Sequence, residues 1–234
     1  NVDGTLDTLT WKNGTTTVAS WEYGYDGAGR VTSIDNNFSE TTSFTYDALG
    51  RLDKKTLANG TREEYAYDAR SRVTDIVLKG GSGYGTTVRS QNYTYDDASN
   101  VLTHTTGGVT TTYGYDDIDQ LVSESRSGYS ASYSYDGNGN RLTRTVNGTT
   151  EDYAYDDADK LLTVKIGTTT IKSFTYDEAG RTTRQTTSAG NTDYTFDEES
   201  RITGITFPNS TTSSYTYNGL DTRISKTENS TTTN

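Results

Sequence analysis

A four-residue motif recurs ten times along this chain of 234 residues, and no other feature restricts the fold as strongly. The motif is an aromatic residue, a small residue, a second aromatic residue and an acidic residue, as in Tyr23-Gly24-Tyr25-Asp26, and Asn218 replaces the acidic residue in the tenth copy. Successive acidic positions are 20 or 21 residues apart, except for one interval of 28. Because a fixed period is the signature of a repeat architecture, we expect residues 1–234 to form a single array of stacked units. The second aromatic residue and the acidic position of the ten copies are Tyr25 and Asp26, Tyr46 and Asp47, Tyr67 and Asp68, Tyr95 and Asp96, Tyr115 and Asp116, Tyr135 and Asp136, Tyr155 and Asp156, Tyr176 and Asp177, Phe196 and Asp197, and Tyr217 with Asn218.

Each copy of the motif predicts a β-strand, a tight turn and a second strand. Side chains alternate between the two faces of a strand, so the two rings share one face and the small residue points to the other. In Asp26-Gly27-Ala28-Gly29 the aspartate can accept a hydrogen bond from the backbone that follows, and the last glycine suits the positive φ of a type I turn with a bulge. The second strand then meets a second turn, which is often an Asn-Gly pair, as at Asn13-Gly14, Asn59-Gly60 and Asn147-Gly148. Each ring is expected to pack on its counterpart in the next repeat.

Three places depart from this regular pattern. Residues 1–20 look like part of a truncated repeat, and the long interval contains a Gly-rich insertion at residues 79–85. We expect this insertion to be a projecting loop, either a tolerated surface insertion or a ligand-binding loop that uses Tyr84. The turns after Asp136 and Asn218 are expected to be one residue longer, because Arg141 and Arg223 stand one position later than the basic residue of other repeats.

The overall composition, taken alone, indicates a disordered chain. Leu, Ile, Val and Phe together make up about 15% of the residues, and the net charge is −11. The 19 tyrosines and their regular spacing outweigh that indication, because a tyrosine ring can be buried while its hydroxyl stays solvated or hydrogen-bonded. The negative charge without a basic stripe argues against a nucleic-acid partner, and no apolar run approaches the ~20 residues of a membrane span.

Few residues suggest catalysis or a cofactor. The chain has no cysteine and one histidine, His104, which lies among threonines and is expected at the surface. Acidic residues sit at equivalent turn positions in several repeats, a pattern that turn geometry explains better than one active site does. The segment from Asp136 to Asn140 resembles the start of a calcium loop but lacks the distal glutamate. We therefore predict a non-enzymatic protein without cofactor or metal.

Two segments carry a resemblance to a known family. Phe44-Thr45-Tyr46-Asp47-Ala48-Leu49-Gly50-Arg51-Leu52 and Phe174-Thr175-Tyr176-Asp177-Glu178-Ala179-Gly180-Arg181 resemble the YD repeat of the Rhs (rearrangement hot spot) family. The resemblance covers nearly the whole chain. It implies an all-β, solenoid-like spiralling sheet of about ten YD β-hairpin repeats, which forms a hollow shell around a C-terminal effector in toxins and part of an adhesion module in teneurins. The self-cleavage motif Asp-Pro-x-Gly-Leu of the toxin-bearing members is absent, since the sole proline is Pro208.

The resemblance favours a structural β-scaffold of a large exported or cell-surface protein, extracellular in location, that forms part of a shell around a cargo or toxin polypeptide. Its partner would then be the rest of the same polypeptide, including an enclosed effector. Two alternatives stay open from the sequence. One is an extracellular filament or adhesin that self-associates through strand edges. The other is a carbohydrate-binding surface built from exposed tyrosines and the Tyr84 loop.

Overall fold

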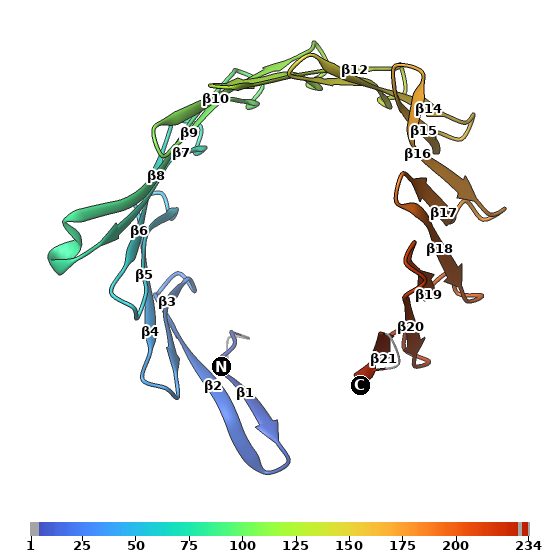
Figure 1. Ribbon diagram of the computed structural model, residues 1–234. Helices are drawn as coiled ribbons and strands as arrows, with labels where there is room; N and C mark the ends of the chain where they lie inside the picture. Colours follow the sequence, from blue (N-terminus) through green and yellow to red (C-terminus); the bar gives the residue numbers. More distant parts are fainter. Residues whose placement is uncertain (1–4, 229–230, 234) are drawn as a thin grey trace. The chain divides into compact units, whose positions relative to one another are not determined.

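The computed structural model describes residues 5–228 and 231–233, so the first four residues of the expected truncated repeat lie outside the described part. The described chain is almost entirely β-structure (Figure 1), with 22 strands and a single short 3-10 helix, η1 (Ser82–Tyr84). It divides into two compact units. Among the described residues, unit 1 comprises 5–119 and 124–128, and unit 2 comprises 120–123, 129–228 and 231–233. The prediction of an all-β chain built from about ten hairpin repeats is confirmed.

Unit 1 contains ten whole strands and part of β11. These strands are β1 (Thr8–Asn13), β2 (Thr16–Tyr25), β3 (Val31–Asn36), β4 (Thr41–Tyr46), β5 (Leu52–Thr56), β6 (Arg62–Tyr67), β7 (Val73–Gly80), β8 (Thr86–Tyr95), β9 (Val101–Thr106) and β10 (Val109–Tyr115). The strand β11 (Leu121–Arg126) is shared between the two units. Unit 2 continues with β12 (Tyr129–Tyr135), β13 (Arg141–Val146), β14 (Thr149–Tyr155), β15 (Leu161–Ile166), β16 (Thr169–Tyr176), β17 (Thr182–Thr187), β18 (Gly190–Phe196), β19 (Ile202–Thr206), β20 (Thr212–Tyr217), β21 (Arg223–Glu228) and β22 (Thr231–Thr233).

Strands that follow one another along the chain pair in antiparallel fashion. In β4 and β5, for example, Phe44 stands opposite Lys55 and Tyr46 opposite Leu52, with a register shift just before Tyr46. The same shift precedes the second aromatic residue in the hairpins β2–β3, β6–β7, β8–β9, β12–β13, β14–β15, β16–β17, β18–β19 and β20–β21. These shifts are bulges of the predicted kind, next to the turn, while the two rings, two residues apart on one strand, share a face through the ordinary alternation of side chains.

The turns after the acidic position share one backbone conformation. The fourth turn residue has a positive φ in all ten repeats, although only four of the ten are glycine (Gly29, Gly50, Gly139 and Gly180) and the others are serine or aspartate. The prediction that two turns are one residue longer is wrong. Asp136 N donates to Asn140 O at 2.9 Å as Asp26 N does to Arg30 O, and Asn218 N donates to Thr222 O at 3.0 Å. Asn140 and Thr222 simply occupy the position that is basic elsewhere.

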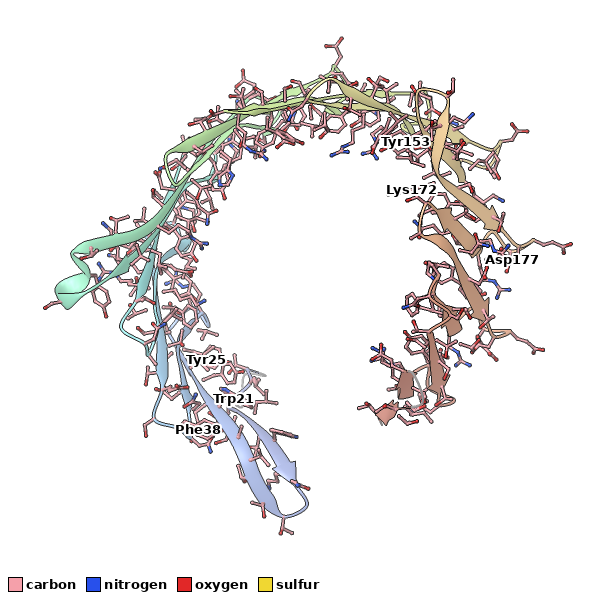
Figure 2. All side chains as sticks on the ribbon, viewed as in Figure 1. Trp21, Tyr25, Phe38, Tyr153, Lys172 and Asp177 are labelled. Atoms are coloured by element: carbon pink, nitrogen blue, oxygen red, sulfur yellow. The ribbon has the colours of Figure 1, made fainter. Side chains whose placement is uncertain are left out.

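The two faces of the sheet differ in chemistry. We define the aromatic face as the one that carries both rings of each repeat together with the residues directly opposite them, such as Lys55 and Leu52. Figure 2 shows Tyr25 in unit 1 and Tyr153 in unit 2 on the concave side of the curve that each unit follows. The other face carries threonine and serine pairs, for example Thr94 and Thr103, whose hydroxyl oxygens are 2.6 Å apart. No side chain in the described part is fully buried, and the buried apolar residues are only Ala19, Ala131 and Val164.

Candidate functional site: the aromatic face and its inter-repeat contacts

The acidic residue of each repeat organises the turn that begins with it. In the second repeat the Asp47 Oδ1 atom accepts hydrogen bonds from the backbone N–H groups of Leu49 and Arg51, each at 2.9 Å. The Oδ2 atom accepts the Arg51 Nε–H at 2.7 Å. These contacts hold the pKa of the Asp47 carboxyl below its ordinary value, chiefly through the backbone N–H of Arg51 and also through its guanidinium. The carboxylate therefore fixes both the turn backbone and the direction of the arginine side chain.

That arginine reaches the next repeat. The Arg51 Cζ atom lies 4.4 Å from the centroid of the Tyr67 ring, within the range of a cation–π contact. Its Nη1–H donates to the backbone oxygen of Asp68 at 3.3 Å. The Tyr67 hydroxyl in turn donates to the backbone oxygen of Leu52, the residue after Arg51, at 2.8 Å. We call this set (Asp47, Arg51, Tyr67 and their equivalents) the Asp–Arg–Tyr contact, and it joins one repeat to the next.

Equivalent contacts recur along both units. A basic group lies 4.4 to 5.5 Å from the second ring of the following repeat in six cases: Arg30 on Tyr46, Arg51 on Tyr67, Arg72 on Tyr95, Lys160 on Tyr176, Arg181 on Phe196 and Arg201 on Tyr217. The tyrosyl hydroxyl donates to a carbonyl oxygen of the preceding repeat, at 2.6 to 3.0 Å, in nine of the ten repeats. Besides Tyr67, these are Tyr25 to Leu6, Tyr46 to Val31, Tyr95 to Val73, Tyr115 to Val101, Tyr135 to Leu121, Tyr155 to Arg141, Tyr176 to Leu161 and Tyr217 to Ile202.

In two repeats asparagine replaces the basic residue, and its side chain still forms a hydrogen bond to the next repeat. The Asn140 side-chain amide donates to Asp136 Oδ2 at 3.0 Å and to Asp159 Oδ1 of the next repeat at 2.6 Å. Asn100 makes the same pair of bonds, to Asp96 and Asp119. In the tenth repeat the Asn218 side-chain oxygen accepts from the backbone N–H groups of Leu220 and Thr222, so a neutral amide also supports the turn.

These contacts correct the expectation that each ring packs on its counterpart in the next repeat. In six repeats the second ring instead meets the guanidinium or ammonium group of the repeat before it. The one stacked ring pair identified in residues 5–228 and 231–233 is Tyr93 with His104, whose ring centroids are 4.7 Å apart. The sequence showed a recurring basic residue four positions after the aspartate, but not that this residue spans two repeats. His104 lies on the aromatic face, half-buried opposite Tyr93, and not on an open surface as expected.

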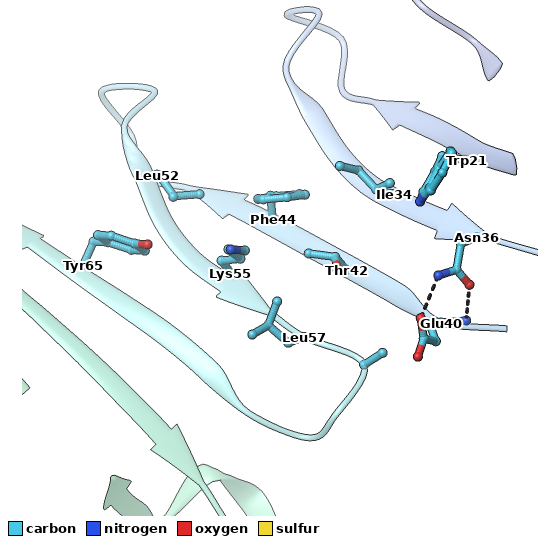
Figure 3. A pocket seen from close by; sticks show the side chains of 11 residues that line it. Trp21, Ile34, Asn36, Glu40, Thr42, Phe44, Leu52, Lys55, Leu57 and Tyr65 are labelled. Carbon is cyan, nitrogen blue, oxygen red and sulfur yellow. Dashed lines mark hydrogen bonds between the residues drawn. The ribbon is translucent and has the colours of Figure 1, made fainter. Parts of the chain in front are cut away.

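The aromatic face of unit 1 is hollowed into a groove of about 620 Å³. Figure 3 shows Trp21, Phe44 and Tyr65 among its lining side chains, from β2, β4 and β6. One edge is polar, because the Asn36 side-chain N–H donates to Glu40 Oε2 at 2.7 Å. Burial and a hydrogen bond to Glu63 raise the pKa of Tyr65 to about 12, so its hydroxyl is protonated at neutral pH. The groove therefore offers apolar rings beside hydrogen-bonding groups.

Two other candidates named from the sequence, Tyr84 and Asp136, contact neighbouring groups of this chain. The ring of Tyr84, in η1, is covered on one face by Arg62, whose Cζ atom is 4.3 Å from the ring centroid. In the calcium-like segment, Asp136 uses its oxygens to accept bonds from Asn138 and Asn140 of its own turn. Within residues 5–228 and 231–233, no cluster of three His, Cys, Asp or Glu side chains is placed to hold a metal ion. The same described residues include no helix with the length and apolar character needed to cross a membrane.

Comparison with known families agrees with this repeat geometry. A family model described as Teneurin YD-shell matches residues 87–230. The chain belongs to the YD-repeat (Rhs) family. A second model, described as RHS Repeat, matches residues 25–62 and 46–82 of this YD-repeat chain. Together the two matches span the ten repeats from Tyr25 onward and confirm the resemblance seen in the sequence.

Individual relatives match the YD-repeat chain over part of their length. It is 31% identical over 108 residues to the double-stranded DNA deaminase toxin A of Burkholderia cenocepacia (strain H111). The matched segment covers 43% of this chain and 8% of the toxin. It superposes on the Photorhabdus luminescens Tc holotoxin pore with a TM-score of 0.71 at 17% identity, and on a TcdB2-TccC3-TEV crystal structure with a TM-score of 0.72 at 18% identity. Each superposition covers 94% of this chain and 13% of the other. The fold is thus shared with segments of much longer proteins.

Proposed function

We propose that this chain is a wall segment of a protein shell whose aromatic face is directed toward an enclosed polypeptide. The observation that carries the proposal is the single-layer architecture: two rings per repeat lie on one face, yet no side chain of the described residues is fully buried. A sheet that carries a row of aromatic residues is usually covered by a second layer, because burying those rings stabilises the fold. An enclosed chain would supply that second layer.

The contacts between repeats support a wall role. In the contact of Asp47, Arg51 and Tyr67, an ion pair within one turn holds the arginine, and a ring contact and a hydrogen bond then tie that hairpin to the next. Neighbouring repeats therefore stabilise each other through their shared interface and do not need a three-dimensional core, as is typical of a repeat protein. The Tc toxin and deaminase toxin segments that share this fold or sequence belong to toxins by name, which suggests that the enclosed polypeptide is a toxin or other effector of the same protein or complex.

Two further statements belong to the same proposal. We propose that the wall segment itself is not catalytic, so that any activity of the parent protein resides in the enclosed polypeptide. Deaminase activity is named only for the Burkholderia cenocepacia toxin, and this chain matches only 8% of that protein. We also propose that the parent protein is exported or displayed at the cell surface, as a toxin shell must be to deliver its contents.

Site-specific crosslinking in the parent protein tests which face meets a cargo. The photoreactive residue benzoylphenylalanine would replace Lys172, which is exposed on the aromatic face, or Thr175, which is exposed on the opposite face of the same strand. We expect light to crosslink position 172, and not position 175, to the enclosed polypeptide. Crosslinks from position 175 alone, or from neither position in an intact particle, would contradict an inward aromatic face.

The groove of Figure 3 favours a second candidate function, carbohydrate binding. Its Trp21, Phe44 and Tyr65 rings can stack against the apolar face of a sugar while the Asn36–Glu40 edge accepts and donates hydrogen bonds. Binding on a glycan array should be lost in Trp21→Ala and kept in Trp11→Ala, because Trp11 is exposed on β1 outside the groove. Loss of binding in Tyr84→Ala alone would instead indicate the insertion loop, and binding to no glycan would exclude both.

A further inference from the structure

One repeat in unit 2 lacks a hydrogen bond that every other repeat makes. In nine repeats the second aromatic residue is a tyrosine whose hydroxyl donates to a carbonyl oxygen of the preceding repeat, such as Tyr176 to Leu161 at 2.8 Å. The equivalent residue of the ninth repeat is Phe196, which has no hydroxyl, and the equivalent carbonyl belongs to Thr182. Phe196 is otherwise placed like the tyrosines, since the Arg181 Cζ atom lies 4.9 Å from its ring centroid. The position that a tyrosyl oxygen fills elsewhere is therefore left for another group.

The same place is hollow. A pocket of about 470 Å³ lies over β17, between Phe174 of β16 and Tyr194 of β18, and Ile202 of β19 also lines it. Thr182 occupies the position that other repeats fill with a larger aliphatic residue such as Leu52, Leu161 or Ile202. A threonine is smaller than leucine or isoleucine, so the substitution opens space directly beside Phe196. The pocket, opened by Thr182, and the missing hydroxyl of Phe196 therefore lie at the same place.

A polar side chain faces into the same pocket without a partner. Gln185 lines the pocket opposite Phe174, at the position that Ile34, Ile76, Val164 and Ile205 occupy in other repeats. Its side-chain amide makes no hydrogen bond with the described part of the chain, and the residue is half-buried. A half-buried amide gains stability from a hydrogen-bonding partner. The pocket thus combines apolar rings, an available backbone acceptor and an amide that can donate and accept.

We propose that this pocket binds the phenol group of a tyrosine side chain presented by the polypeptide that lies against the aromatic face. The ligand ring packs against Phe174, Tyr194 and Ile202, and its hydroxyl donates to the Thr182 carbonyl oxygen in place of the tyrosyl hydroxyl found in nine other repeats. The Gln185 amide is in the same pocket to donate to the phenol oxygen. The inference rests on the proposed shell function for the source of the tyrosine, but the chemistry of the pocket is a property of this chain alone.

The direct test compares two ligands that differ by one hydroxyl. N-acetyl-L-tyrosinamide and N-acetyl-L-phenylalaninamide would be titrated into the whole chain, with binding followed by NMR. One additional hydrogen bond is expected to make the tyrosine ligand bind about 2- to 12-fold more tightly. Equal affinity for the two ligands, or no binding of either, would overturn the proposal.

Two substitutions separate the hydrogen bond from the cavity. Phe196→Tyr supplies the missing hydroxyl from the protein itself, so the preference for the tyrosine ligand should disappear while both ligands still bind. Thr182→Leu fills the space as Leu161 does in its own repeat, so both ligands should fail to bind. Thr175→Val, on the opposite face of the same sheet, should change neither affinity. A preference that survives in Phe196→Tyr would refute the role of the Thr182 carbonyl.

A third probe identifies the source of the phenol. If 4-methylphenol binds but N-acetyl-L-tyrosinamide does not, the pocket accepts only small free phenols and the proposed polypeptide occupant is wrong. If the tyrosine ligand binds with the expected preference while position 172 gives no crosslink to a cargo, the pocket chemistry stands and the shell function fails. The two failures are therefore distinguishable.

Discussion

The hydrogen bond between neighbouring repeats can be removed by deleting one oxygen atom. In Tyr67→Phe the ring and its contact with Arg51 stay, but the donor to the Leu52 carbonyl oxygen, 2.8 Å away, is lost. Partial burial of the Tyr67 hydroxyl is also the main reason why its pKa is raised, so this group lies in a place with reduced access to water. A typical intramolecular hydrogen bond contributes about 0.5 to 1.5 kcal/mol to stability. We expect the free energy of unfolding to fall by about 1 kcal/mol.

The matched control is Tyr113→Phe. Tyr113 is a first-position ring on the same face of unit 1, and its hydroxyl has no hydrogen-bond partner among the residues that the structure describes. Both variants lose one oxygen atom, but only Tyr67→Phe loses a bond. Urea unfolding followed by circular dichroism should show a lower midpoint for Tyr67→Phe with an unchanged slope, and little change for Tyr113→Phe. Thermal unfolding should show a decrease of about 2 to 4 °C for Tyr67→Phe.

Identical midpoints for the two variants would refute the reasoning, because the tyrosyl bond would then contribute nothing beyond the ring. The reciprocal experiment uses Phe196→Tyr, which adds the hydroxyl where it is absent. That variant should gain stability of the same order, about 1 kcal/mol. A loss of stability in Phe196→Tyr would show that the ninth repeat cannot accept the arrangement of the other nine.

Three further outcomes follow from the turn contacts. In the folded chain the pKa of carboxyls such as Asp47 lies below its ordinary value of 3.8. Their stabilising effect is therefore present above pH 3.8 and is lost as the pH falls below that value. Unfolding midpoints should decrease as the pH is lowered from about 5 to about 2. Gly50→Ala should destabilise the chain more than Gly29→Ala does, as urea unfolding midpoints can measure. Both glycines have a positive φ, so the backbone strain is similar. A Cβ atom at residue 50, however, would lie 3.1 Å from Arg30 Nη1, whereas one at residue 29 meets nothing within 4 Å. Asn100→Arg should place a guanidinium over the ring of Tyr115 and raise the free energy of unfolding by about 0.5 to 1 kcal/mol, and an unchanged or lower urea midpoint would show that the asparagine link is the better one.

Much of the local structure could be predicted because it depends on short-range rules. The period located the ten hairpins, the alternation of side chains placed both rings on one face, and the aspartate located the bulged turn. The prediction of turn length failed where asparagine takes the place of the usual arginine. Arg141 suggested a longer turn after Asp136, but Asn140 reproduces the hydrogen bond of the usual arginine, so the turn keeps its length.

The sequence by itself determined which residues form strands and which face each of them occupies, because these properties repeat every two residues and are set by backbone geometry. Only the tertiary structure decided what lies between successive rings. The twist and register of neighbouring hairpins bring Arg51 over Tyr67 and carry the Tyr67 hydroxyl to the Leu52 carbonyl, 15 residues earlier in the chain. The same geometry makes Phe196 informative, since an ordinary aromatic replacement in the sequence becomes, in three dimensions, a missing donor beside an open pocket.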